Sequence, residues 1–83
     1  MDSLVNLTEL IVKRLVNDSE SVSVKEFSTE DENEIQIEVL ISQDDMGRVI
    51  GKNGKIINSV RTLVQAASSI ENTKKVKINV DSY

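Results

Sequence analysis

The sequence predicts an α+β domain in which helices pack on one face of a three-stranded mixed sheet. Three segments alternate apolar and polar residues, as half-buried strands do, and three others carry apolar residues at helical spacing. Their order along the chain is helix, two strands, two helices and a last strand, α-β-β-α-α-β. A chain of 83 residues suffices for one modest core, so residues 1–83 are expected to form a single domain.

The first helix is predicted to follow a cap at Asp2 or Ser3 and to end near Asn17. Apolar residues recur there with the 3.6-residue period of an amphipathic helix, at Leu4, Leu7, Ile11 and Leu15. One face of this helix is therefore expected to cover the sheet.

Two strands should follow as an antiparallel hairpin. Residues 21–25 alternate around Val22 and Val24, and Phe27 falls out of phase with them, which predicts a bulge or a strand end at that point. Residues 35–41 give the cleanest alternation in the chain. The acidic run 30–34 precedes that strand and is expected to be a solvated loop.

The second half of the chain predicts a helical crossover to a third strand. Ser42 and Asp45 have the spacing of a capping box before a short helix, and Gly51 should end that helix. Gly54 should open a longer helix that fades at residues 68–69. The strand at 75–80 is then reached by a crossover, so it is expected to run parallel to the second strand.

Composition excludes several kinds of chemistry. The chain has no cysteine and no histidine, which rules out a disulfide framework, the usual zinc sites and catalysis by an imidazole or a thiolate. No apolar stretch has the length of a transmembrane span, and no basic region precedes an apolar one at the N-terminus. These features predict a cytoplasmic protein without a signal peptide or membrane insertion.

Charge is divided unevenly along the chain. The net charge is -4, but residues 1–45 contain 12 acidic and 3 basic residues, whereas residues 46–83 contain 7 basic and 2 acidic residues. Between positions 46 and 70 the charged residues are Arg48, Lys52, Lys55 and Arg61. Because phosphate attraction depends on potential within about 8 Å, an acidic protein of this kind is compatible with weak, salt-sensitive nucleic-acid binding.

The segment Val49–Ile57 contains the strongest candidate site. Gly51 and Gly54 allow a sharp turn between two helices and let a ligand approach the main chain without meeting a Cβ atom. The first N–H groups of the second helix face the same place, and Lys52 and Lys55 add positive charge. A sugar-phosphate backbone fits such a loop. Apolar residues that could line a groove for bases are Val49, Ile50, Ile56 and Ile57.

Other interpretations of these residues remain open. Gly51 and Gly54 can form a helix C-cap and a tight turn without binding anything, although a turn explains neither the lysines nor the missing carboxylates. Arg48 and Arg61 fit a solvated helix face or a subunit interface as well as an RNA contact. Ile57 fits the core before it fits a groove.

A nucleotide-binding enzyme is rejected. The segment from Gly47 to Lys52 is one residue shorter than a Walker A loop, and Asn53 stands where Ser or Thr should bind magnesium. No strand leads directly into the segment either. The protein is therefore not expected to be an enzyme, and no cofactor or metal is expected.

The pattern Ile50-Gly51-x-x-Gly54-x-x-Ile57-x-x-Val60, in its α-β-β-α-α-β context, resembles the core of a type II K-homology (KH) domain. More narrowly, residues 45–55 and 60–63 are similar to the KhpA family of small bacterial single-KH proteins. The resemblance implies binding of single-stranded RNA, with a role as an RNA chaperone or post-transcriptional regulator. It also implies a homodimer, or a heterodimer with a KhpB (EloR/Jag)-like protein.

By that resemblance, the residues that clamp the RNA backbone would be Gly51, Lys52, Asn53 and Gly54. Arg48, Lys55 and Arg61 would flank the clamp, with Ile50 and Ile57 beside the bases. The chain has one Phe and one Tyr, so recognition should depend on hydrogen bonds and aliphatic contacts rather than on stacking.

A single KH unit holds only about four nucleotides, so a dimer would strengthen binding. We expect the exposed part of the second core helix, around residues 61–69, to supply the dimer surface. The alternative is a protein-interaction or dimerisation module whose RNA loop is vestigial.

Overall fold

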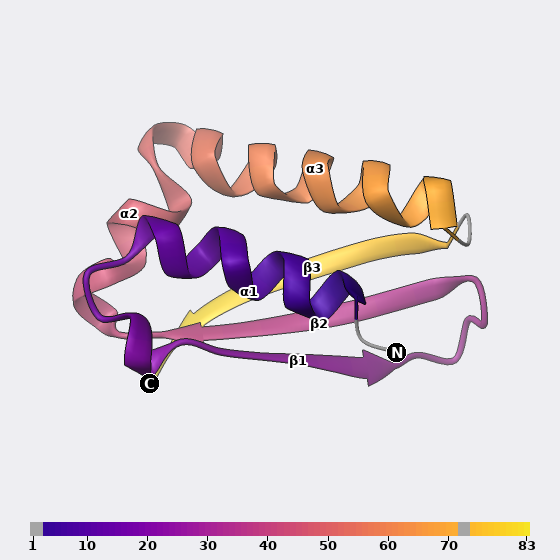
Figure 1. Cartoon of the computed structure of the whole chain (residues 1–83), viewed down its shortest axis with the longest axis horizontal. Helices are drawn as coiled ribbons and strands as arrows, with labels where there is room; N and C mark the ends of the chain where they lie inside the picture. The colour runs from indigo at the N-terminus through magenta and orange to yellow at the C-terminus, as the bar shows by residue number, and fades with distance from the viewer. Residues whose placement is uncertain (1–2, 72–73) are drawn as a thin grey trace.

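The computed structural model describes residues 3–71 and 74–83. Its helices and strands follow the predicted order (Figure 1). They are α1 (Ser3–Leu15), β1 (Ser23–Ser28), β2 (Glu34–Ile41), α2 (Met46–Ile50), α3 (Lys55–Glu71) and β3 (Lys75–Ser82). Short 3-10 turns lie at Ser19–Ser21, Gln43–Asp45 and Lys52–Gly54. In the part of the chain that the structure describes, no helix is long and apolar enough to span a membrane.

The sheet has the predicted mixed topology. Its strand order is β1-β2-β3, with β1 antiparallel and β3 parallel to β2. The backbone N–H of Lys75 donates to Asn33 O at one end of β3, and that of Tyr83 donates to Ile41 O at the other. Odd-numbered residues of β3 thus bond to β2, and the even-numbered residues direct their N–H and C=O groups to the free edge.

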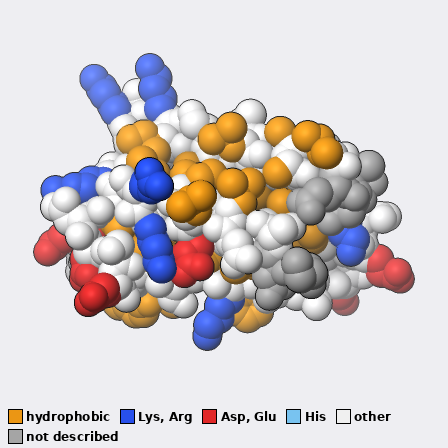
Figure 2. All heavy atoms as spheres, viewed as in Figure 1, with side chains coloured by type: hydrophobic (Ala, Val, Ile, Leu, Met, Phe, Trp, Pro, Cys, Tyr) orange, Lys and Arg blue, Asp and Glu red, His pale blue; other side chains and the backbone are white. Residues whose placement is uncertain are grey.

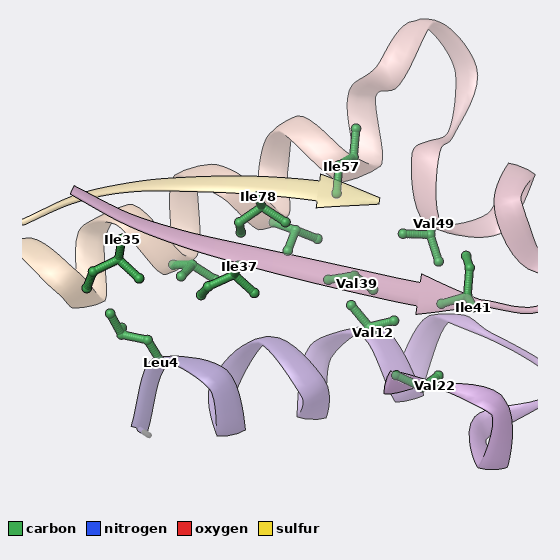
Figure 3. Close-up of a cluster of buried hydrophobic side chains, with 12 residues drawn as sticks. Leu4, Val12, Val22, Ile35, Ile37, Val39, Ile41, Val49, Ile57 and Ile78 are labelled. Atoms are coloured by element: carbon green, nitrogen blue, oxygen red, sulfur yellow. The ribbon is translucent and has the colours of Figure 1, made fainter. Parts of the chain in front are cut away.

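The core lies between this sheet and the helices on one of its faces (Figures 1 and 3). Alternate residues of β2 point inward and are fully or nearly fully buried, namely Ile35, Ile37, Val39 and Ile41. They pack with Leu4 and Val12 of α1, and with Val60 and Val64 of α3. Burial of these side chains, each contributing about 1.5–3 kcal/mol, holds α3 over the sheet.

The bulge predicted at Phe27 is wrong. The pairing of β1 with β2 continues without interruption from Ser23 to Ser28. Phe27 is out of phase with Val24 because its side chain lies on the outer face of the sheet, where it is 49% exposed. The strand ends one residue after Phe27, close to the other predicted outcome.

The predicted capping box is also wrong. Ser42 precedes the Gln43–Asp45 turn but makes no side-chain hydrogen bond to it, and Asp45 bonds elsewhere. α3 is longer than predicted, because the Ser68 hydroxyl is buried and donates to Lys74 O at 2.7 Å instead of ending the helix. The alternative N-terminal cap Asp2 lies outside the described residues.

Candidate nucleic-acid interface

The turn between α2 and α3 has an unusual backbone conformation. Gly51 has φ 75° and ψ 176°, a region available essentially to glycine alone. Asn53 has φ 57° and Gly54 has φ 75°. Three of four consecutive residues thus have positive φ, which turns the chain sharply between the two helices. Asn is among the few non-glycine residues that tolerate this conformation.

Gly51 also makes a close approach that no side chain permits. Its N–H donates to Gly47 O at 2.9 Å and closes α2. A Cβ atom at position 51 would lie 2.6 Å from Cγ1 of Ile56, which belongs to the first turn of α3. The main chain therefore passes directly over α3. Gly54 has room for a Cβ, so its requirement for glycine comes from backbone conformation alone.

The loop carries exposed cations at one end of the molecule. Lys52, Asn53 and Lys55 are exposed, and positively charged side chains project into solvent from this end (Figure 2). The acidic loop between β1 and β2 lies at the opposite end of the long axis, which extends 34 Å (Figure 1). The negative charge of the hairpin is thus kept away from the glycine loop.

Arg48 and Asp45 form a joint between α2 and the end of α1. Arg48 Nη1 donates to Asp45 Oδ1 at 3.1 Å and to Asp44 O at 3.1 Å. Asp45 accepts two further hydrogen bonds, from the backbone N–H groups of Asn17 and Asp18, each at 3.1 Å. Asp45 as a whole is 1% exposed. A single buried carboxylate thus ties the segment after α1 to the start of α2.

These contacts shift the acidity of Asp45. The N–H of Asn17 is the largest influence that holds the pKa of Asp45 below its ordinary value. The N–H of Asp18 and the Arg48 guanidinium act in the same direction, and burial opposes them. Asp45 therefore stays ionised, and folding is linked to that charge.

Arg61 lies on the side of α3 that faces β3 and is separated from the glycine turn in sequence. Its guanidinium makes hydrogen bonds within the fold. Its Nε and Nη2 atoms donate to Ile78 O at 3.2 and 3.0 Å, and its Nη1 donates to Asn58 Oδ1 at 3.0 Å. Gln65 pairs with the same strand, accepting from Val76 N–H at 2.8 Å and donating to Lys74 O at 3.0 Å. Side chains of α3 thus cap the free edge of β3.

A shallow hollow of about 470 Å³ runs between α3 and β3. Its lining contains no carboxylate and consists of Arg61, Thr62, Gln65, Ala66 and Val76. The two isoleucines predicted to lie beside bases differ in exposure, because Ile50 is half-buried whereas Ile57 is 5% exposed and belongs to the core. Within residues 3–71 and 74–83, no cluster of acidic side chains is arranged to hold a metal ion.

Comparison with known proteins decides the family. The sequence profile described as KhpA/KhpB, KH domain, matches residues 6–80. This chain belongs to the KhpA/KhpB KH-domain family.

Relatives match over most of their length. "RNA-binding protein KhpA" of Clostridium perfringens is 46% identical over 70 residues, covering 84% of this chain and 91% of that protein. The protein of the same name from Streptococcus pneumoniae is 35% identical over 81 residues, 98% of both chains. Its name describes an RNA-binding protein rather than an enzyme.

A solved structure shows the same fold. Era, in a crystal structure with MgGDPNP and a segment of 16S ribosomal RNA, matches 95% of this chain with a TM-score of 0.67 at 14% identity. The chain spans 29% of that protein, so the likeness concerns the fold of the matched part. The element order and the mixed sheet of this chain fit the expected type II KH topology.

Two side chains that hold the elements around the candidate site in place escape sequence reasoning. Asp45 looks like a helix cap, but its partners at Asn17 and Asp18 are nearly thirty positions away and only the fold brings them together. Gln65 resembles any polar residue on a helix surface, yet it satisfies the edge of β3. The only feature of the sequence that singles out Asp45 is its position before a helix, and that position predicts a local helix cap rather than a contact with residues after α1.

Replacing Gly51 by alanine should destabilise the protein, because strain of order 1–3 kcal/mol adds to the clash with Ile56. Gly47→Ala provides the matched control, since a Cβ there meets nothing within 4 Å and position 47 is helical. The free energy of unfolding of Gly47→Ala should be higher than that of wild type by about 0.5–1 kcal/mol. Urea denaturation measures both. Equal free energies of unfolding for the two variants would contradict this account of the turn.

Asp45→Asn should lower stability at neutral pH by removing the charge that Asn17, Asp18 and Arg48 satisfy. The folded pKa of Asp45 lies below the unfolded value of about 3.9. Its contribution is therefore complete above that pH and is lost as pH falls through the folded pKa. The difference in the free energy of unfolding between wild type and Asp45→Asn should narrow below about pH 4. Asp44→Asn, at an exposed neighbour, should show no comparable gap in thermal unfolding across pH.

Proposed function

We propose that residues 1–83 act as a single KH unit that binds single-stranded RNA in the cytoplasm through the Gly51–Gly54 loop. The observation that carries this proposal is the loop itself. Lys52 and Asn53 are exposed within it, Lys55 follows it, and the carboxylate-rich hairpin lies at the far end of the molecule.

The RNA backbone would cross the loop at the start of α3. The N–H of Lys55 already donates to Lys52 O, so this place attracts a phosphate chiefly through the positive end of a 17-residue helix. Lys52 and Lys55 add mobile positive charge. Neither has a partner among the described residues, so neither must break an ion pair before it contacts a phosphate. Asn53 supplies a neutral polar group at the crest of the turn.

Bases would extend from the loop toward the hollow between α3 and β3. Ile50 is partly accessible and offers an aliphatic contact at the loop. Arg61 is held by Ile78 O, so it presents its remaining N–H donors in a fixed position. Ile57 acts indirectly by anchoring the first turn of α3 in the core, and Arg48 acts by fixing α2 through Asp45.

We propose that the protein functions as a dimer, because about four nucleotides per KH unit give weak binding. α3 carries an exposed apolar stripe within and just beyond the predicted dimer surface, made of Leu63 and Ile70, which lie two helical turns apart. Leu63 is 57% exposed and Ile70 is 86% exposed. The partner is a second copy or a KhpB (EloR/Jag)-like protein, and the complex serves as an RNA chaperone or post-transcriptional regulator.

The same stripe favours the second candidate function, a dimerisation module that no longer uses its RNA loop. Large apolar side chains exposed together on one helix mark an interaction surface. The two functions differ in what they require of the loop. RNA binding needs its positive charge, whereas a pure interaction module does not.

RNA binding by the loop can be tested with the double variant Lys52→Asp, Asn53→Asp. Asp tolerates the positive φ of position 53 about as well as Asn does, so the turn should survive. Fluorescence anisotropy with single-stranded RNA at two salt concentrations should show that salt-dependent binding is lost. Circular dichroism should show an unchanged fold.

The matched control is Lys25→Asp, Asn33→Asp, which makes the same charge change at exposed positions on β1 and the hairpin loop. It should reduce affinity far less than the loop variant does. Equal binding by wild type and the folded loop variant would sink the RNA-clamp proposal and leave the dimerisation module.

Dimerisation through α3 predicts that Leu63→Asp yields a monomer, because a charge would replace an apolar contact in the stripe. Multi-angle light scattering at high protein concentration measures the mass. Phe27→Asp removes an exposed apolar side chain from the outer sheet face and should leave the dimer intact. A wild-type protein that is monomeric and does not pair with a KhpB-like partner would refute this interface.

A further inference from the structure

Two exposed basic residues, Lys13 and Arg14, lie in the last turn of α1, next to α2. We propose that RNA longer than the segment held by the glycine loop continues across α2 onto α1, where Arg14 binds a phosphate and Leu10 contacts a base or sugar. This inference rests on the proposed RNA-binding function and adds a site outside the loop and the α3–β3 hollow.

The fold brings the end of α1 to the start of α2 (Figure 1). Asn17 and Asp18, which follow α1 directly, donate their N–H groups to Asp45 immediately before Met46. Arg14 lies about one helical turn before Asn17. These two parts of the chain are about thirty positions apart in sequence, and the buried carboxylate fixes their relative position.

The distance from this joint to the glycine loop is short. α2 has 5 residues and so rises about 7 Å, which is within the Debye length of about 8 Å at physiological salt. Figure 2 shows lysine and arginine side chains over α1 and over the turn from α2 to α3, with carboxylates between them at the same end. Cations at both ends of α2 therefore act on the same stretch of a polyanion.

Arg14 is available for an external phosphate, and its neighbours are not. Lys13 is paired with Glu9 at 3.2 Å, and Arg48 is paired with Asp45 at 3.1 Å. Arg14 is exposed and has no partner among the described residues. Guanidinium groups suit phosphate because they present two parallel N–H donors.

Leu10 gives the same surface an apolar part. It precedes Arg14 by four residues and so lies on the same helix face. It is 54% exposed although α1 buries its other leucine and isoleucine side chains more fully. A single exposed leucine is ordinary on a protein surface, but here it shares one helix face with an unpaired arginine. A nucleotide, with a charged backbone and an apolar base, fits both side chains.

Acidic residues limit where this track can run. Asp18 and Glu20 are exposed in the turn that follows α1, and Asp44 is exposed immediately before α2. They would repel phosphates beyond the end of α1 and at the very start of α2. The RNA is therefore directed along the exposed face of α1, past Arg14 toward Leu10, and away from the 3-10 turn.

The experiment compares two random-sequence RNA pools, of five and twelve nucleotides, by competition anisotropy against wild type and Arg14→Ala. Arg14→Ala should weaken binding of the longer pool by about three- to tenfold, while the shorter pool, which the loop alone can hold, binds unchanged. For Arg14→Ala and the longer pool, a plot of the logarithm of the binding constant against the logarithm of the salt concentration should have a slope smaller in magnitude by about 0.7 than that of wild type. This is the value for one lost phosphate contact on a single strand. Arg14→Lys should restore most of the slope.

Lys25→Ala is the matched control, because it removes an exposed cation from the outer face of the sheet. It should leave both pools unaffected, and light scattering should show that Arg14→Ala keeps the oligomeric state of wild type. Equal losses for both pools, or no loss for either, would overturn the α1 site while wild type still binds. If wild type binds neither pool, the proposed RNA-binding function itself fails.

Discussion

The parallel pairing of β3 with β2 is the constraint on which the rest of the structure depends. A hairpin cannot join parallel strands, so the chain must leave the end of β2, cross the sheet and return to the start of β3. The crossover contains α2, the glycine turn and α3. Because β1 and β2 are joined by a loop at the other end, the acidic hairpin and the glycine turn are kept at opposite ends of the molecule (Figure 1).

Asp45 makes this arrangement rigid where it matters for the candidate site. α2 has only 5 residues, too few to be stable alone. Its start is anchored by a buried carboxylate that also holds the chain after α1, and its end is closed by Gly51 N–H on Gly47 O. The position of the loop over α3 therefore depends on a charge interaction at one end of α2 and on a backbone conformation at the other.

The helices and strands with strong apolar periodicity could be predicted from the sequence. The apolar side chains that make the pattern are the same ones that are buried when the element packs on the core. The alternation of Ile35, Ile37 and Val39 specifies a strand with one face inside. Phe27 misled because alternation alone does not show which face of an edge strand is covered, and only the position of the helices settles that. In the site, glycine spacing identified the turn, but the roles of Asp45 and Gln65 depend on partners that only the tertiary fold brings near.

The net charge of an RNA-binding candidate is a poor guide to where it binds. The excess of acid in this chain is concentrated in its first half, yet Arg14 belongs to that half and lies in the last turn of α1, at the end of the molecule that carries the glycine turn (Figure 1). Acidic residues at the other end oppose sliding along a polyanion, so they reduce non-specific affinity more than binding at the loop. A protein of this kind gains selectivity from the charges that it places away from the site, and it needs a second contact, from α1 or from a partner subunit, to recover affinity.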